Sequence, residues 1–343
     1  MRRSSWAPSC ATSPGPSARR CWQAGDPPHE ARQAPPRGDT RVSTWSDAAI
    51  PTLEGRRAIV TGGNSGIGYW TALLLAAHGA SVVIAGRNAT RGEAAVARIQ
   101  DDVPRARVKA ALLDLADLSS VWAFAERESA SRAALDLLVN NAGIAVPPDG
   151  RTKDGFETTL GTNHLGHFAL TGLLLAQLLQ APAPRVVVVA SNAAQRARID
   201  FDDLQGKRRY DRWRAYSQSK LANLLFMREL QRRAGAAGSS LVAVAAHPAF
   251  AATGIARGFG GPRWLQRLAA RVLPLIATPP RQGALPTLYA ATMPVPGGSY
   301  WGPGRNGTGP APAALPPAAL DPETARRLWD VSERLTGVSF DAV

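Results

Sequence analysis

From Arg56 onward, short apolar runs alternate with segments of helical length, and this alternation limits the fold more than any other feature of the sequence. The runs are continuously apolar, which is typical of strands buried on both faces of a sheet. Such strands, separated by helices, predict a parallel sheet covered by helices on both sides. The predicted strands are 58–60, 81–84, 108–113, 135–139, 186–189 and 241–245, and the predicted helices are 67–78, 118–129 and one that begins near Thr90.

A glycine-rich turn follows the first predicted strand directly. Residues 61–68 read Thr-Gly-Gly-Asn-Ser-Gly-Ile-Gly and lead into a predicted helix. Glycines at a strand-to-helix turn allow tight backbone geometry and let the chain approach a pyrophosphate at the helix N-terminus. A glycine turn alone is weak evidence and also reads as a simple tight connection, but its position between a strand and an amphipathic helix favours a dinucleotide-binding loop. We therefore predict an α/β fold, a single doubly wound Rossmann domain with a parallel sheet.

Tyr216 and Lys220 stand four residues apart in a segment that reads as helix, so both side chains lie on one helical face. A positive charge beside a phenol favours phenolate, and Lys220 is therefore expected to lower the pKa of Tyr216. Only four Lys occur in a chain that writes nearly every cation as Arg, which supports a specific need for an ammonium at 220. The alternative is a solvated Tyr–Lys pair on an exposed helix.

Composition excludes several functional classes. The net charge of +14 suggests nucleic-acid binding, but the Arg residues are scattered and no recognition motif is present, so no nucleic-acid partner is predicted. No run of 18 apolar residues occurs, and no membrane span is predicted; the apolar segment 168–179 reads as a buried helix. Both cysteines, Cys10 and Cys21, precede the predicted domain, which suits a reducing compartment and predicts a cytoplasmic protein.

Residues 1–48 differ from the rest in being rich in Ser, Pro, Arg and Gly without a sustained period. This composition predicts a disordered tail, because it buries too little surface to offset the entropy of ordering. An Arg-rich, acid-poor start can mimic a transit peptide, but a disordered tail is the preferred reading. A start codon assigned too early would explain such a tail, with Val42 as a plausible start. The predicted domain covers 49–343.

The ordered set of motifs resembles the short-chain dehydrogenase/reductase family. It comprises the glycine turn, Asn140-Asn141-Ala142-Gly143 after the fourth strand, Asn163, Ser191 after the fifth strand, and the Tyr216/Lys220 pair. Within the family the chain is most similar to the retinol-dehydrogenase-like group, through residues 162–168, residues 216–230 and the 25-residue step from Ser191 to Tyr216. The resemblance covers roughly residues 45–340.

The resemblance implies a catalytic role for four residues. Tyr216 would exchange the proton, Lys220 would lower its pKa and hold the nicotinamide ribose, Ser191 would bind the substrate oxygen, and Asn163 would anchor a water relay. Individually, Ser191 also reads as a strand-end cap and Asn163 as an ordinary polar helix residue. The implied cofactor-binding residues are Gly62, Asn64, Ser65, Gly66, Ile67, Gly68, Arg87, Asp114, Leu115, Asn140, Ala142, Gly143, Tyr216, Lys220, Pro248 and Thr253.

The end of the second predicted strand indicates which cofactor is bound. Members that use NAD usually carry an acidic residue there, whereas this chain has Arg87, which suits the 2′-phosphate of NADP. We therefore predict NADP over NAD, with a surface Arg as the alternative. After the sixth strand the chain departs from the family, with Ala249 following Pro248 where glycine is usual.

These features predict an NADP-dependent oxidoreductase that interconverts a carbonyl and an alcohol. The alternative is a non-catalytic NADP-binding sensor or scaffold on the same fold. A substrate lid is predicted around 250–280, where the apolar stripe Trp264, Leu265, Leu268, Val272 and Ile276 favours a lipophilic small molecule or else packs on the sheet or on a partner subunit of a homo-oligomer. His164 and His167 have no third ligand in reach, so no metal site is predicted and both read as packing or supporting groups.

Overall fold

The computed structural model describes residues 45–248, 278–304 and 309–343. The chain divides into two units, Met1–Val42 and Ser43–Val343, and everything below concerns the second. Most of the predicted tail and of the predicted lid, including Thr253 and Trp264, lies outside the described residues. The folded unit makes tertiary contacts from Trp45 onward, because the Trp45 ring packs edge-on against Tyr289 with centroids 5.3 Å apart.

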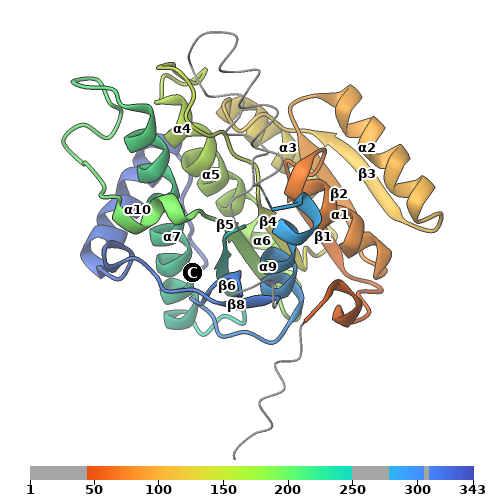
Figure 1. Cartoon of the computed structure of the whole chain (residues 1–343). Helices are drawn as coiled ribbons and strands as arrows, with labels where there is room; N and C mark the ends of the chain where they lie inside the picture. The colour runs from red at the N-terminus through yellow and green to blue at the C-terminus, as the bar shows by residue number, and fades with distance from the viewer. Residues whose placement is uncertain (1–44, 249–277, 305–308) are drawn as a thin grey trace, which may run out of the picture. The chain divides into compact units, whose positions relative to one another are not determined.

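A mostly parallel sheet forms the centre of this unit (Figure 1). Within the described residues the strand order is β3-β2-β1-β4-β5-β6-β7-β8, and every pair is parallel except β7 with β8. The order reverses direction between β1 and β4, where an open α/β sheet binds its ligands. The strands are β1 (Arg57–Thr61), β2 (Ser81–Gly86), β3 (Arg107–Leu112), β4 (Leu137–Asn140), β5 (Arg185–Val189), β6 (Val242–Ala246), β7 (Tyr300–Pro303) and β8 (Pro310–Pro312).

Helices cover both faces of the sheet, as continuously apolar strands require. On one face lie α1 (Gly66–Ala77), α2 (Ala89–Asp102) and α9 (Pro280–Thr292). On the other lie α3 (Leu118–Ala130), α5 (Gly166–Leu173), α6 (Leu175–Gln180), α7 (Arg212–Ala236) and α10 (Pro322–Thr336). Along β1, Ile59 packs into the core on the side of α5 and α7, whereas Ala58 and Val60 pack into the core on the side of α1 and α9. This is the two-residue alternation of a strand.

Short helical segments complete the chain and place several site residues. They are η1 (Asp47–Ala49), α4 (Thr158–Leu160), the π-helical turn η2 (Gly161–Leu165), η3 (Asn192–Arg196) and η6 (Pro317–Ala319). The turn η2 runs directly into α5, and all five of its residues are buried.

The predicted doubly wound fold and all six predicted strands are confirmed, with ends shifted by one or two residues. Two details differ from the prediction. The predicted single helix 168–179 is divided at Leu174 into α5 and α6. The sheet also ends in an antiparallel pair, β7 with β8. Pro310 and Pro312 lie in the edge strand β8, and Pro303 is the last residue of β7, past the residues that pair with β6, so all three stand where proline is tolerated.

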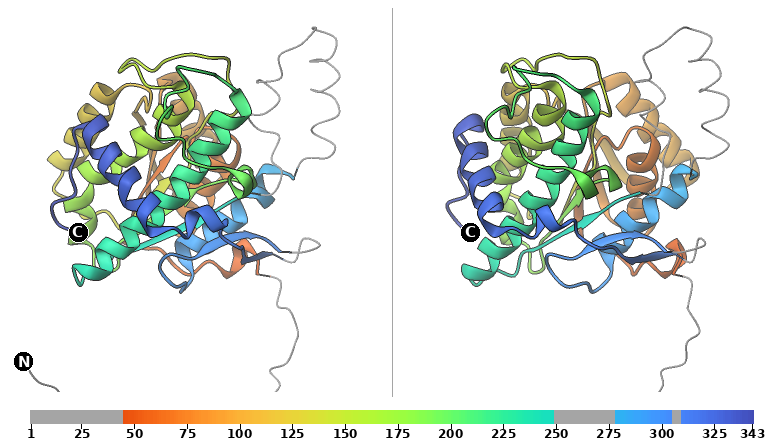
Figure 2. Two further views of the ribbon diagram at one scale, coloured as in Figure 1. Left: turned by 90° about the vertical axis from the view of Figure 1, so that its left-hand side faces the viewer. Right: turned by 60° about the vertical axis from the view of Figure 1, so that its left-hand side comes forward.

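Helix α10 packs against the helices α5 and α7, at the side of the unit that the left view of Figure 2 turns toward the viewer. An aromatic cluster joins them. Trp329 of α10 stacks on Phe226 of α7 at 5.8 Å and meets Phe168 of α5 edge-on at 5.1 Å, and Phe340 lies 4.9 Å from Phe168. Aromatic contacts of this kind add to the stabilisation from burial alone. The two helical segments that follow β4 and β5 are thus fixed between the sheet and α10.

Candidate active site

The glycine turn folds tightly against the loop that follows β4. Gly62 and Gly66 adopt positive φ values of 66° and 56°, which disfavour any side chain. A Cβ on Gly68 would lie 2.4 Å from the Gly62 carbonyl oxygen and 2.5 Å from Asn141 Nδ2. The Ser65 side chain makes no capping hydrogen bond to α1, so the first-turn N–H groups have no side-chain cap. This arrangement fits a pyrophosphate at the N-terminus of α1.

Thr61, at the end of β1, ties the loop 140–144 to the glycine turn. Its Oγ1 accepts hydrogen bonds from the backbone N–H groups of Asn141 and Ala142, both at 2.9 Å. Its carbonyl oxygen accepts a third, from Asn141 Nδ2 at 2.8 Å. The side chain of Asn140 is fully buried and donates to Thr171 Oγ1 at 2.9 Å, which makes it a link to α5 rather than a surface for a ligand.

Asn163 lies in the π-helical turn η2 and holds the other end of the same loop. Its Oδ1 accepts from Ile144 N at 2.9 Å, and its Nδ2 donates to Ile144 O and to Ser219 Oγ, both at 3.0 Å. Both amide N–H groups are engaged, which leaves one Oδ1 lone pair for the water relay that the resemblance implies. Single π-turns inside helices occur frequently at functional sites.

The four residues that the sequence singles out as catalytic converge at the end of β5. A Cβ on the exposed Gly143 would lie 3.2 Å from Asn163 Oδ1 and 3.4 Å from Lys220 Nζ. Lys220 Nζ donates to Val189 O at 3.1 Å and lies 6.0 Å from the centre of the Tyr216 ring. Ser191 Oγ accepts from Ala193 N at 3.2 Å, so its own O–H can donate to another group.

Burial sets the protonation of this cluster. It lowers the pKa of Lys220 to about 8 and raises the pKa of the Tyr216 phenol, and a hydrogen-bond interaction with Ser191 opposes the rise at Tyr216. The sequence-based expectation that Lys220 lowers the pKa of Tyr216 is not met in this structure. Desolvation of the phenol outweighs an ammonium that lies 6.0 Å from the ring centre.

The remaining predicted cofactor residues either follow the strands β2 and β3 or lie at the glycine turn, in the loop after β4 or after β6. Arg87 is exposed just beyond β2, and Asn88 beside it caps α2 by accepting from Arg91 N at 2.8 Å. Asp114 Oδ1 accepts from Ala116 N at 3.0 Å, whereas the Leu115 side chain is buried in the core. The predicted residues that lie at the turn, the loop or the strand ends are Gly62, Asn64, Ser65, Gly66, Ile67, Gly68, Ala142, Gly143 and Pro248.

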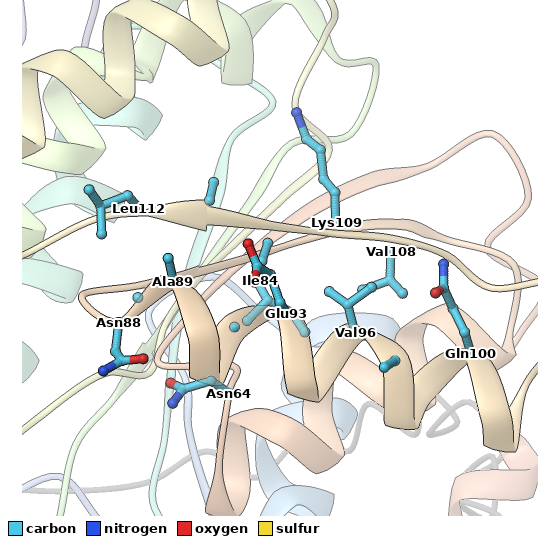
Figure 3. A pocket seen from close by; sticks show the side chains of 15 residues that line it. Asn64, Ile84, Asn88, Ala89, Glu93, Val96, Gln100, Val108, Lys109 and Leu112 are labelled. Atoms are coloured by element: carbon cyan, nitrogen blue, oxygen red, sulfur yellow. The ribbon is translucent and has the colours of Figure 1, made fainter.

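A cavity of about 380 Å³ lies between α2 and the strands β2 and β3 (Figure 3). Its lining includes the apolar residues Ile84, Val96 and Val108 and the charged residues Glu93 and Lys109. It reaches the glycine turn through Asn64 and the end of β2 through Asn88. The cavity therefore borders the end of the site that holds Arg87, and none of its lining residues belongs to the cluster around Tyr216.

Both histidines of the turn η2 and helix α5 are buried and hydrogen-bonded, as the reading of packing or supporting groups predicted. His164 Nε2 lies 2.8 Å from Ser332 Oγ, and His167 contacts Thr61 and Asn163. Among the described residues, no three His, Cys, Asp or Glu side chains gather as they would to hold a metal ion. In the same ranges, no helix has the length and apolarity needed to cross a membrane.

Comparison with known proteins identifies the family of the chain. The family model for short chain dehydrogenases matches residues 56–260. Human retinol dehydrogenase 12 is 40% identical over 293 residues, which cover 84% of this chain and 89% of that protein; human retinol dehydrogenase 13 is 39% identical over 298 residues, covering 85% and 88%.

Solved structures share the fold. An uncharacterised protein from Mycobacterium paratuberculosis is 43% identical, with a TM-score of 0.73, and the match covers 86% of this chain and 98% of that one. A short chain dehydrogenase from Shigella flexneri 2a, solved with NADP, is 23% identical with a TM-score of 0.57, covering 74% and 98%. The retinol-dehydrogenase-like resemblance is confirmed. The chain belongs to the short chain dehydrogenase family and is an NAD(P)-dependent oxidoreductase that acts on CH–OH groups.

Proposed function

We propose that this protein interconverts a lipophilic aldehyde or ketone and the corresponding alcohol with NADP, using Tyr216, Lys220, Ser191 and Asn163. The observation that carries the proposal is the convergence of Asn163 Oδ1 and Lys220 Nζ on the backbone of Gly143, beside the Tyr216–Ser191 pair. A buried ammonium, a phenol and a hydroxyl donor beyond the end of one strand are the groups that carbonyl reduction needs.

The bound nicotinamide supplies or accepts the hydride, and the residues of this chain handle the proton and the charge. In reduction, Tyr216 donates its phenolic proton to the carbonyl oxygen, and the Ser191 O–H donates a hydrogen bond to the same oxygen as negative charge develops. One of the three N–H groups of Lys220 Nζ donates to Val189 O, and the other two can donate to the ribose hydroxyls. In oxidation, Tyr216 takes up the hydroxyl proton by the reverse step.

NADP preference in this proposal rests on Arg87. The residue is exposed at the end of β2, on the side of the glycine turn that the 380 Å³ cavity borders, and Asn88 beside it caps α2. A guanidinium binds a 2′-phosphate through charge-assisted hydrogen bonds, and no acid follows β2 to bind the ribose hydroxyls of NAD. The structural neighbour from Shigella was solved with NADP.

Arg87→Asp should lower the NADPH-to-NADH ratio of kcat/KM by at least about tenfold, since it replaces attraction to a phosphate by repulsion. Arg105→Asp is the matched control, because it makes the same charge change at an exposed residue beyond the opposite end of α2. Steady-state kinetics with both cofactors give the two ratios. Equal use of NADPH and NADH by the wild type would already remove Arg87 as the selector.

The lipophilic substrate class is supported by the names of the relatives, which are retinol dehydrogenases, and by the apolar stripe that the sequence places in the predicted lid. In a series of straight-chain aldehydes assayed with NADPH, kcat/KM should rise with chain length. Equal turnover of short polar carbonyls would refute the lipophilic class. Binding of NADPH without turnover of any carbonyl would favour the non-catalytic sensor instead.

A further inference from the structure

Four groups surround the hydroxyl of Thr61, more than a hydroxyl can bind at once. Besides the N–H groups of Asn141 and Ala142, both at 2.9 Å, His167 Nε2 lies at 2.9 Å and the carbonyl oxygen of Val139 at 3.2 Å. A hydroxyl has one hydrogen to donate and two lone pairs that accept. The two backbone N–H groups fill both lone pairs, so His167 and Val139 compete for the single hydrogen.

The other ring nitrogen of His167 decides this competition. Nδ1 lies 3.0 Å from the carbonyl oxygen of Asn163, which can only accept, so Nδ1 carries a proton. The ring is fully buried, and burial lowers the pKa of His167 to about 4, which keeps it neutral at pH 7. A neutral ring with its proton on Nδ1 has a bare Nε2, and this nitrogen accepts the hydrogen of Thr61.

This protonation state satisfies every group in the network. If Nε2 carried the proton, Thr61 Oγ1 would face three donors with two lone pairs, and the Asn163 carbonyl would face a bare Nδ1. If His167 offered no acceptor, the Thr61 hydrogen would turn toward Val139 O at 3.2 Å. That rotation about the Cβ–Oγ1 bond would swing the lone pairs away from the N–H groups of Asn141 and Ala142.

The loop that depends on Thr61 contacts the cofactor turn directly. A Cβ on Gly62 would lie 3.0 Å from the Cα of Ala142, so the two backbones are in contact, and at its far end the loop is held by Asn163 through Ile144. Thr61 and Asn163 thus fix the two ends of the loop, and His167 contacts both of them, Thr61 through its Nε2 and the Asn163 carbonyl through its Nδ1.

We propose that His167 is a positioning residue, which fixes loop 141–144 between the glycine turn and the catalytic cluster by presenting a bare Nε2 to Thr61 and an Nδ1–H to Asn163. The importance of this loop for binding and turnover rests on the proposed function; the protonation of His167 does not. His167 itself touches neither substrate nor cofactor in this role.

His164 provides an internal control. It lies three residues away in the same buried segment, and burial likewise lowers its pKa, to about 3. Its Nε2, however, pairs with Ser332 of α10, on the side away from the glycine turn. His164→Phe should therefore reduce stability as a buried hydrogen-bond deletion does, yet leave NADPH affinity and kcat within about twofold of the wild type.

Three substitutions separate the two contacts of His167. His167→Gln places an amide oxygen near the position of Nε2, where it can accept from Thr61, and loses the bond to Asn163 O. His167→Asn places an amide N–H near the position of Nδ1 and is too short to reach Thr61. His167→Phe loses both. We expect the Kd for NADPH to stay within about twofold in the Gln variant and to rise about tenfold in the Asn and Phe variants.

A double-mutant cycle tests whether His167 acts through Thr61. Thr61→Val removes the hydroxyl while nearly preserving shape, and the variant that combines it with His167→Phe should bind NADPH no more weakly than Thr61→Val alone. Fold losses that multiply would overturn the proposal, and so would equal affinity losses in the Gln and Phe variants.

The wild-type protein gives a test that needs neither variants nor turnover. Long-range proton–nitrogen NMR correlations on histidine-labelled protein at pH 7 should show the His167 proton on Nδ1 and a bare Nε2. A proton on Nε2 overturns the inference whatever the activity. If the NMR and NADPH-binding results agree with expectation while no carbonyl is reduced, the proposed function fails and the positioning role stands.

Discussion

Tyr216→Phe is expected to reduce carbonyl turnover with NADPH by about 10²–10⁴-fold, the range that a positioned general acid contributes. Only the phenolic oxygen is removed, so the half-buried ring remains packed near Lys220. The melting temperature and the Kd for NADPH should therefore stay close to wild-type values. Single-turnover kinetics with saturating NADPH, together with fluorescence titration of the cofactor, measure the two effects separately.

A second tyrosine supplies the control for this substitution. Tyr289 lies in α9, and its ring packs against Trp45 and Trp301 at 5.3 and 4.6 Å, away from the catalytic cluster. Tyr289→Phe removes the same atom and should leave turnover unchanged. Retention of full activity in Tyr216→Phe would show that the proton comes from another group and would end the mechanism proposed for this site.

The protein should lose stability steeply as the pH falls from 6.5 toward 4, because its buried histidines must stay neutral. Burial is the leading cause that lowers the pKa of His164 to about 3 and of His167 to about 4, below the ordinary value near 6.5 of an unfolded chain. Their contribution is complete above pH 6.5, where both states are neutral. This contribution to the unfolding free energy decreases below pH 6.5, because the histidines become protonated in the unfolded chain but stay neutral in the folded protein.

Each of these histidines removes about 1.4 kcal/mol of unfolding free energy per pH unit in this range, or about 2 kcal/mol each by pH 5. Urea unfolding at pH 7 and pH 5 measures the loss. His247, whose pKa burial also lowers, adds in the same direction. The carboxyls with lowered pKa, such as Asp117 and Glu229, contribute mainly below pH 5, so the interval from 6.5 to 5 isolates the histidines.

Replacing both His164 and His167 by Gln provides the comparison. This double variant should be less stable than the wild type at pH 7, yet its unfolding free energy should change less between pH 7 and pH 5, by about 4 kcal/mol. An unchanged difference between the two pH values would mean that neither histidine is held neutral in the folded protein.

The sequence predicts the strands and the convergence of the site residues well, because both follow from short-range patterns. Continuous apolar runs such as 186–189 identify strands buried on both faces, and Ser191 lies directly after one of them. Because the central strands are parallel neighbours in the doubly wound fold, the residues at their carboxyl ends lie along one edge of the sheet.

Features that depend on distant contacts are the ones the sequence could not provide. The edge strand β8 is three residues rich in proline, and its pairing with β7 has no periodic signal. The predicted direction of the Tyr216 pKa shift is wrong. The spacing to Lys220 indicates proximity, whereas the burial that raises the pKa depends on the whole fold. His167 read as a supporting group, but its partner Thr61 lies 106 residues away, and no local pattern joins the two.

The closure of the loop between β1 and β4 has a consequence for how the protein acquires its activity. The hydrogen bonds of Thr61 to Asn141 and to His167 span 80 and 106 residues, and the entropy cost of closing such loops has to be met before the bonds contribute. An early folding intermediate with β1–β3 paired would contain the glycine turn, and one with β5, β6 and α7 docked would contain Tyr216 and Lys220. Neither would bring the two together, so catalytic competence requires the pairing of β1 with β4.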